Sequence, residues 1–125
     1  MTDRPAPSDQ ELEVLKVLWD EGPATVRGVD AVLRVRGVRR AYTTVQTLLG
    51  RLQGKGHVAI EAKPGGHVYR ATSTRDDLLR DRLRDLADQL CEGEPSPLVL
   101  TLVEGHRFSD EEIARFRAVL DRHRP

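Results

Sequence analysis

The sequence predicts a mostly helical (α+β) protein in which one β-hairpin separates two groups of three helices. Apolar residues recur at helical spacing in six segments, and hydroxyl residues precede four of them. Two short runs with strand character also flank a Lys-Pro-Gly-Gly turn. The chain has 125 residues, zero net charge and only 4% aromatic residues. We therefore expect one or two small domains with cores built mostly of Leu and Val.

The first two helices are predicted from their capping residues. Ser8 and Glu11 form a capping box, in which a hydroxyl at the N-cap is followed three residues later by a carboxylate. Apolar residues then follow at helical spacing, and a Gly-Pro pair ends this helix near Asp20. Thr25 caps a second helix, and Gly37 closes it.

The third helix is expected over residues 43–55, with Gly56 as its left-handed C-terminal cap. At about 100° per residue, its apolar side chains gather on one side. These are Val45, Leu48, Leu49 and Leu52. The opposite side is small and polar and consists of Thr43, Thr47, Gly50, Arg51 and Gly54, with Thr44 and Gln46 at its margins. One face therefore suits a domain core and the other suits a partner.

Residues 58–62 and 67–71 are expected to pair as a hairpin around the turn at 63–66. Three helices followed by a two-stranded hairpin is the order of a winged helix-turn-helix. Residues 25–73 also carry nine basic residues against two acidic ones, which indicates a polyanion-binding surface. We therefore expect residues 1–73 to be a winged-helix domain that binds double-stranded DNA.

The predicted DNA contacts lie in the third helix, just before it, and at the hairpin tip. Thr and Gln can hydrogen-bond to base edges in the major groove, and Arg can bind guanine or a phosphate. The outward glycines would let the helix backbone approach DNA closely. The candidate DNA-binding residues are Arg39, Arg40, Thr43, Thr44, Gln46, Thr47, Arg51, Lys55 and Lys63.

Residues 74–125 are expected to form a three-helix dimerisation domain. Thr74 caps a long polar helix that runs to about Cys91, Pro97 begins a short apolar helix, and a capping box at Ser109 opens the last one. The long helix has only a narrow leucine seam, which it cannot bury alone. Packing about a two-fold axis is the economical solution, and folding back on the first domain is the alternative. The candidate dimerisation residues are Leu79, Leu83, Leu86, Leu90, Leu98, Leu102, Ile113, Phe116 and Leu120.

Several segments resemble the penicillinase repressor family of the BlaI/MecI/CopY type. AYTTVQTLLGRLQGKG resembles the recognition-helix region of that family, and LEVLKVLWDEGPATVRGV resembles its first two helices. PLVLTLVEG and SDEEIARFRAVL extend the likeness over most of the chain. The resemblance implies a winged-helix homodimer that represses by covering a roughly palindromic operator. It also implies that Thr43, Thr44, Thr47 and Arg51 face that operator.

The resemblance implies an induction route as well. In the antibiotic-resistance branch, a membrane sensor-protease system cuts an Asn–Phe bond in the short helix after the long one. The corresponding residues here are Thr101 and Leu102, the candidate cleavage site and a departure from that pattern. The copper branch uses a C-terminal cysteine cluster, whereas this chain has only Cys91, so we do not expect copper sensing by that chemistry.

Other function classes find little support in the sequence. No catalytic, nucleotide-binding or zinc-protease motif is present, so we expect neither enzymatic activity nor a cofactor. The four histidines, His57, His67, His106 and His123, are scattered and are expected to be surface or wing residues. No apolar run is long enough to span a membrane, and no signal segment opens the chain, so a cytoplasmic protein is expected.

Two alternatives remain open at this level. A metal- or thiol-responsive regulator could use Cys91 with His106 or His123, within one chain or across a dimer. A winged helix could also serve only protein contacts, in which case the protein would show no salt-dependent DNA binding.

Overall fold

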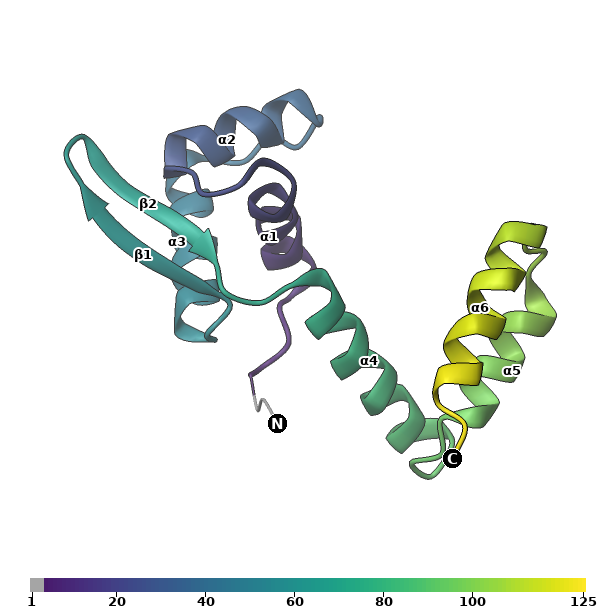
Figure 1. Cartoon of the computed structure of the whole chain (residues 1–125). Helices are drawn as coiled ribbons and strands as arrows, with labels where there is room; N and C mark the ends of the chain where they lie inside the picture. The colour runs from purple at the N-terminus through teal and green to yellow at the C-terminus, as the bar shows by residue number, and fades with distance from the viewer. Residues whose placement is uncertain (1–3) are drawn as a thin grey trace. The chain divides into compact units, whose positions relative to one another are not determined.

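The computed structural model describes residues 4–125, which form six α-helices and one two-stranded antiparallel sheet (Figure 1). The fold class expected from the sequence is confirmed. The chain divides into two compact units, one ending at Arg80 and one from Asp81 to Pro125. In chain order the elements are α1 (Asp9–Glu21), α2 (Val26–Val35), α3 (Tyr42–Gly54), β1 (Val58–Lys63), β2 (Gly66–Ala71), α4 (Arg75–Leu90), α5 (Ser96–Gly105) and α6 (Asp110–Arg122).

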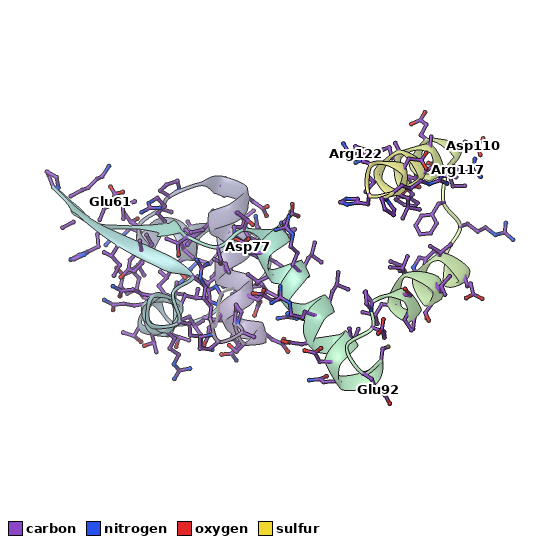
Figure 2. All side chains as sticks on the ribbon, turned by 60° about the horizontal axis from the view of Figure 1, so that its bottom comes forward. Glu61, Asp77, Glu92, Asp110, Arg117 and Arg122 are labelled. Carbon is purple, nitrogen blue, oxygen red and sulfur yellow. The ribbon has the colours of Figure 1, made fainter. Side chains whose placement is uncertain are left out.

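The predicted helix caps are present in the structure. Ser8 Oγ accepts from the Glu11 amide at 3.2 Å, and the Ser8 amide donates to Glu11 Oε1 at 3.1 Å. Ser109 forms the same reciprocal pair at the start of α6. Thr74 forms a third with Asp77, which is labelled on α4 in Figure 2. Each pair satisfies amide groups that a helix start leaves without intrahelical partners.

α3 begins one residue before the predicted start and ends as the sequence indicates. Gly56 has a φ of 86°, a value that favours glycine. The Gly56 amide donates to the Gln53 carbonyl at 3.0 Å, and the His57 amide donates to the Leu52 carbonyl at 2.9 Å. These two bonds form a Schellman motif. They end the helix abruptly and place His57 against the residues that follow the hairpin.

The hairpin is slightly longer than the sequence predicts. Its register pairs Val58 with Ala71 and Lys63 with Gly66, so only two residues lie in the loop. The segment between α1 and α2 adds an unpredicted bridge. Ala24 and Tyr69 exchange two backbone hydrogen bonds, of 3.0 and 2.8 Å. This bridge fixes the hairpin beside the start of α2.

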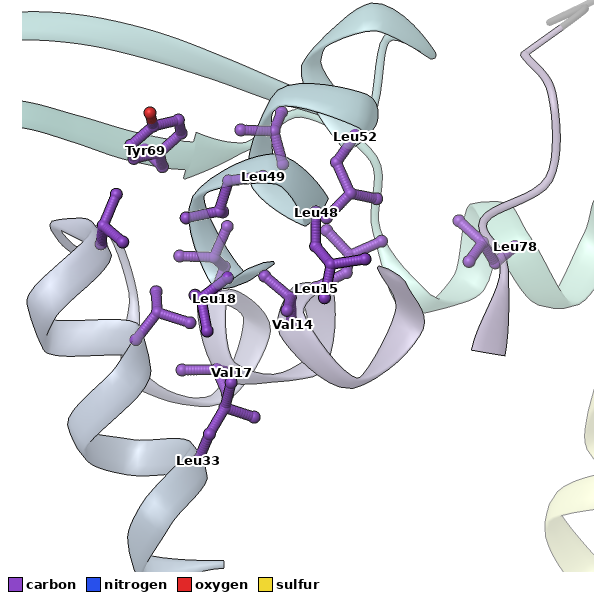
Figure 3. Packing of buried hydrophobic residues seen from close by; sticks show 14 residues of the cluster. Val14, Leu15, Val17, Leu18, Leu33, Leu48, Leu49, Leu52, Tyr69 and Leu78 are labelled. Carbon is purple, nitrogen blue, oxygen red and sulfur yellow. The ribbon is translucent and has the colours of Figure 1, made fainter. Parts of the chain in front are cut away.

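One apolar core holds the first unit together (Figure 3). The four residues predicted for the inner face of α3 are all buried, and they pack with residues of α1, α2 and the hairpin. Leu78 from the first turn of α4 joins the same core. The Trp19 indole nitrogen donates to the Ser73 carbonyl at 2.7 Å. The start of α4 is therefore part of the first unit.

The second unit buries far less of its apolar surface within the chain. α5 and α6 contain no buried residue, and Ala87 is the buried apolar residue on the second-unit part of α4. A groove of about 340 Å³ between α4 and α5 is lined mainly by apolar residues, including Leu83, Leu98 and Leu102. Within the described residues, no helix has the length and apolar character needed to cross a membrane.

Candidate DNA-binding surface

The outer face of α3 is open and polar. Thr43, Gln46, Thr47 and Arg51 are exposed, whereas the leucines on the opposite side are buried. A Cβ atom added at Gly50 would meet nothing within 4 Å, and the same holds at Gly54. Packing within the chain therefore does not require glycine at either position. Because neither position carries a side chain, another molecule can approach the helix backbone closely there.

A shallow groove of about 240 Å³ brings several predicted residues together. Thr43, Thr44, Thr47 and Arg51 line it, together with Leu48 and Gln10 from α1. The Thr47 hydroxyl donates to the Thr43 carbonyl at 2.9 Å, which leaves its oxygen lone pairs and its methyl group as outward features. These side chains offer hydrogen-bonding groups, a methyl group and a fixed positive charge on one surface. This is the chemistry that base edges in a major groove require.

A second groove, of about 440 Å³, lies between α2, α3 and the hairpin. Its lining contains no carboxylate, and its polar side chains are those of Thr25, Arg27, Tyr42, Gln46, His67 and Tyr69. Arg27 and Tyr42 are not among the DNA-binding residues predicted from the sequence. The available signal was the place of Arg27 in the basic block, next to a helix cap. Such a groove suits a phosphate backbone that passes beside the recognition helix.

Two predicted DNA-binding residues are held by contacts inside the first unit. Arg40 Nη2 donates to Glu13 Oε1 at 2.7 Å. Lys55 Nζ donates to the buried Glu11 Oε1 at 2.6 Å and to the Ala6 carbonyl at 3.1 Å. These bonds fix both ends of α3 to α1 and to the segment before it.

Burial raises the pKa of Glu11, but hydrogen bonds from Lys55 and Ser8 and the Lys55 charge outweigh that effect. The net pKa of Glu11 is below its usual value. Glu11 therefore remains a carboxylate at neutral pH, paired with Lys55 at the end of α3.

Three other predicted DNA-binding residues, Arg39, Arg51 and Lys63, are exposed, whereas Thr44 is half-buried. Arg39 and Arg51 have no ion-pair partner among residues 4–125. Lys63 lies 3.8 Å from Glu61, and Arg70 lies 3.6 Å from the same carboxylate, which is labelled on the hairpin in Figure 2. The hairpin therefore carries a mixed charge, whereas the outer face of α3 carries one cationic side chain, Arg51, and no carboxylate.

One histidine expectation is wrong. His57 is buried, with 2% of its surface exposed, whereas His67, His106 and His123 are exposed as expected. The Schellman turn after α3 brings residue 57 against the residues before α1 and before α4, and these distant residues cover its side chain. Cys91 is half-buried, and no cluster of three or more potential metal ligands occurs in the described part of the chain.

The predicted dimerisation residues have little cover within the chain. Leu98 and Ile113 are half-buried, and the other seven are exposed. On α6, Phe116 packs edge-on against Phe108, with ring centroids 5.0 Å apart. Exposed leucines at this density are unusual for a surface that faces only water.

A comparison with known families decides what kind of protein carries this surface. The model of the penicillinase repressor family matches residues 7–122. The chain belongs to the penicillinase repressor family. This is a family of DNA-binding transcriptional repressors rather than enzymes, and the resemblance seen in the sequence is confirmed.

Two similar proteins cover most of the chain. The penicillinase repressor of Bacillus licheniformis is 27% identical over 124 residues, which are 96% of this chain and 93% of that protein. An uncharacterised 16.5 kDa protein encoded in the ptsI 3′ region of Latilactobacillus sakei is 24% identical over 110 residues, or 88% of this chain and 75% of that protein.

A solved structure supports the same assignment to the penicillinase repressor family. It is the solution structure of the Bacillus licheniformis BlaI monomeric form in complex with the blaP half-operator. The two chains are 31% identical, with a TM-score of 0.51, and the match covers 62% of this chain and 93% of that chain. The winged-helix fold is therefore confirmed by a relative as well as by the element order.

Proposed function

We propose that this chain is a cytoplasmic, homodimeric repressor that binds a roughly palindromic operator through α3 of each protomer. The open polar face of α3, opposite four buried apolar residues, is the observation that carries this proposal. The similar BlaI chain, whose monomeric form was solved on a half-operator, supports one protomer for each half-site. Two-fold symmetric proteins bind two-fold symmetric sites.

The residues have different roles in this proposal. Thr43, Thr44, Thr47 and Arg51 read base edges, because they share the groove on the outer face of α3. Gln46 lies at the edge of that face and lines the second groove. Arg39 and Lys63 contact phosphates from the flanks of α3 and from the hairpin tip. Arg27 and Tyr42 hold the backbone strand that occupies the second groove.

Arg40 and Lys55 add positive potential from the two ends of α3, where Glu13 and Glu11 hold them. The exposed leucines of α4, α5 and α6 form the dimer interface. We propose this because their burial between two copies would remove from water a surface that the chain leaves uncovered.

Salt-dependent DNA binding tests the central claim. The chain is used to select duplexes from a random pool, and the affinity for the winning sequence is measured at several salt concentrations. If each protomer neutralises about four phosphates, the slope of log K against log salt will be about −7. A chain that binds no duplex at low salt, or binds all duplexes equally, would contradict the proposal. It would instead favour a winged helix that contacts only proteins.

Two arginine variants separate base reading from phosphate binding. Arg51→Ala is expected to cost about 1–3 kcal/mol and to relax selectivity at one operator position. Arg27→Ala is expected to weaken binding to all sequences equally and to reduce the salt slope by about 1 for each half-site. Arg122→Ala, an exposed arginine at the end of α6, is the matched control and should leave both quantities unchanged.

We further propose that the regulated genes include those for β-lactam resistance and that a membrane sensor-protease system relieves repression by cutting between Thr101 and Leu102. Both residues are exposed in the middle of α5. Proteolysis needs locally unfolded backbone, so this helix must open before cleavage. Intact-mass measurement of the chain from cells treated with a β-lactam tests this. A chain that stays uncut while its target genes are induced would contradict it.

A further inference from the structure

His57 is a buried histidine that the DNA-binding face does not use. Its side chain lies between the end of α3, the residues before α1 and the residues that enter α4. His57 Nε2 is 2.7 Å from the Pro5 carbonyl oxygen, and Nδ1 is 2.9 Å from Ser73 Oγ. A carbonyl oxygen can only accept, so Nε2 carries a hydrogen and donates it. In the neutral ring, Nδ1 then accepts from the Ser73 hydroxyl.

Backbone and side-chain bonds reinforce the same junction. The Thr72 amide donates to the His57 carbonyl at 2.8 Å, and the Thr72 hydroxyl donates to the Gly56 carbonyl at 2.9 Å. Arg4 Nη1 donates to the Thr72 carbonyl at 3.3 Å. The two residues that follow the C-cap of α3 are therefore bonded directly to the two residues that precede the N-cap of α4.

The first turn of α4 is fixed on its other sides as well. The Trp19 indole donates to the Ser73 carbonyl, Leu78 lies in the core, and Arg75 lies 3.4 Å from Asp20 and over the Trp19 ring. Among residues 4–125, His57 is the buried histidine that joins the end of the recognition helix to the residue before the N-cap of α4, and it is bonded at both ring nitrogens. Removing either partner of such a buried polar group lowers the stability of the folded chain.

We propose that His57 is a positioning residue that sets the direction in which α4 leaves the winged helix and thereby the spacing of half-sites that a dimer accepts. This proposal rests on the dimeric repressor function proposed above. α4 has 16 residues, which corresponds to about 24 Å of helix. A tilt of about 10° at its base would move its far end by about 4 Å, close to the rise of one base pair, about 3.4 Å.

Two variants test this role at different severity. Ser73→Ala removes the partner of Nδ1 but keeps the carbonyl that Trp19 contacts, and His57→Leu removes both histidine bonds. His123→Leu, at an exposed histidine, is the control. The affinity of each protein is measured for three kinds of duplex. These are the operator selected by the unaltered chain, that operator with its spacer one base pair longer or shorter, and a duplex that holds one half-site.

Affinity for the single half-site is expected to stay within about twofold in both variants, because the face of α3 is untouched. Affinity for the selected operator is expected to fall about tenfold in His57→Leu and less in Ser73→Ala, and discrimination against the altered spacers should shrink. The control should match the unaltered chain.

Two results would overturn the proposal. One is undiminished spacer discrimination in both variants, and the other is an equal loss on half-site and full operator, which indicates a purely structural role. If His57→Leu does not fold, as judged by thermal unfolding, Ser73→Ala decides alone. An unaltered chain that binds the operator but tolerates every spacer would also overturn it, whereas a chain that binds no duplex would overturn the proposed function instead.

Discussion

The two compact units differ in how they satisfy their apolar side chains. In the first, Val14, Val29, Val45 and Leu49 are each 0% exposed and share one core. In the second, Leu83 is 51% exposed and Leu120 is 65% exposed. The first unit is complete within one chain, whereas the second leaves apolar surface in water that another surface could bury.

This difference matches the proposed roles of the two units, which are DNA binding for the first and dimerisation for the second. A DNA-reading face needs a rigid support, and the core behind α3 provides it. A dimer interface, by contrast, is made of side chains that stay exposed until the partner arrives.

The largest effect is expected from charges placed in the leucine seam. Leu83→Asp combined with Leu86→Asp should dissociate the proposed dimer, because its interface would bury uncompensated carboxylates. Loss of bivalent binding should reduce operator affinity by about 100-fold or more. Analytical ultracentrifugation and DNA binding measure both effects.

The control for the seam variant is Val35→Asp, which changes an 88% exposed valine at the end of α2. It should leave both the mass of the assembly in solution and the affinity for the operator unaltered. If the double-aspartate protein remained dimeric and bound its operator normally, the leucine seam of α4 would not be part of the dimer interface.

The next effect, on the free energy of unfolding, is expected from shortening one leucine in each unit. Leu49→Ala removes a fully buried side chain and should lower the free energy of unfolding by about 2–5 kcal/mol at every protein concentration. Leu120→Ala removes an exposed one and should matter only at concentrations where the dimer forms. Denaturant unfolding at high and low protein concentration distinguishes the two. A concentration-dependent loss in Leu49→Ala would contradict the view that the first unit is complete by itself.

Acid pH should act mainly on the first unit, through Glu11. Because the pKa of this group is lower in the folded chain than its reference value of 4.5, its stabilisation is present above pH 4.5 and is lost as the pH falls through the lowered pKa. Glu11→Gln should lower the free energy of unfolding by about 1–3 kcal/mol at neutral pH. In acid, the stabilities of the variant and of the unaltered chain should converge. Melting temperatures across this range measure the effect.

Glu112→Gln is the equivalent change in the second unit. The pKa of Glu112 is also lowered, by its hydrogen bonds with Ser109, but this carboxylate is fully exposed. Its pH effect should therefore be the weaker of the two. Equal acid sensitivity in the two variants would show that the buried pair of Glu11 with Lys55 contributes nothing beyond capping.

Periodicity and capping rules predicted the elements and the two faces of α3 because both depend on local sequence. The buried side of α3 needs only the spacing of its four apolar residues. The left-handed glycine after α3 is likewise a local signal, and Gly56 adopts that conformation.

Features that depend on distant segments were not predictable in this way. His57 is buried because residues near position 5 and position 73 meet over it. Lys55 pairs with a carboxylate 44 positions earlier in the chain. The groove that contains Arg27 and Tyr42 is formed by three separate elements, and the faces of single helices do not reveal it.

The smallest effect is expected from removing a helix cap. Here the two units can be compared with the same substitution, because α1 and α6 start with the same capping box. Ser8→Ala and Ser109→Ala each remove one N-cap hydroxyl, a change that costs about 1 kcal/mol. α1 packs into a finished core, so Ser8→Ala should lower the melting temperature equally at all protein concentrations. α6 has no buried residue, so Ser109→Ala should weaken the dimer and lower the melting temperature only where dimer dissociation is linked to unfolding. Melting curves over a wide concentration range separate these outcomes, and identical behaviour of the two variants would mean that α6 is stabilised by its own chain.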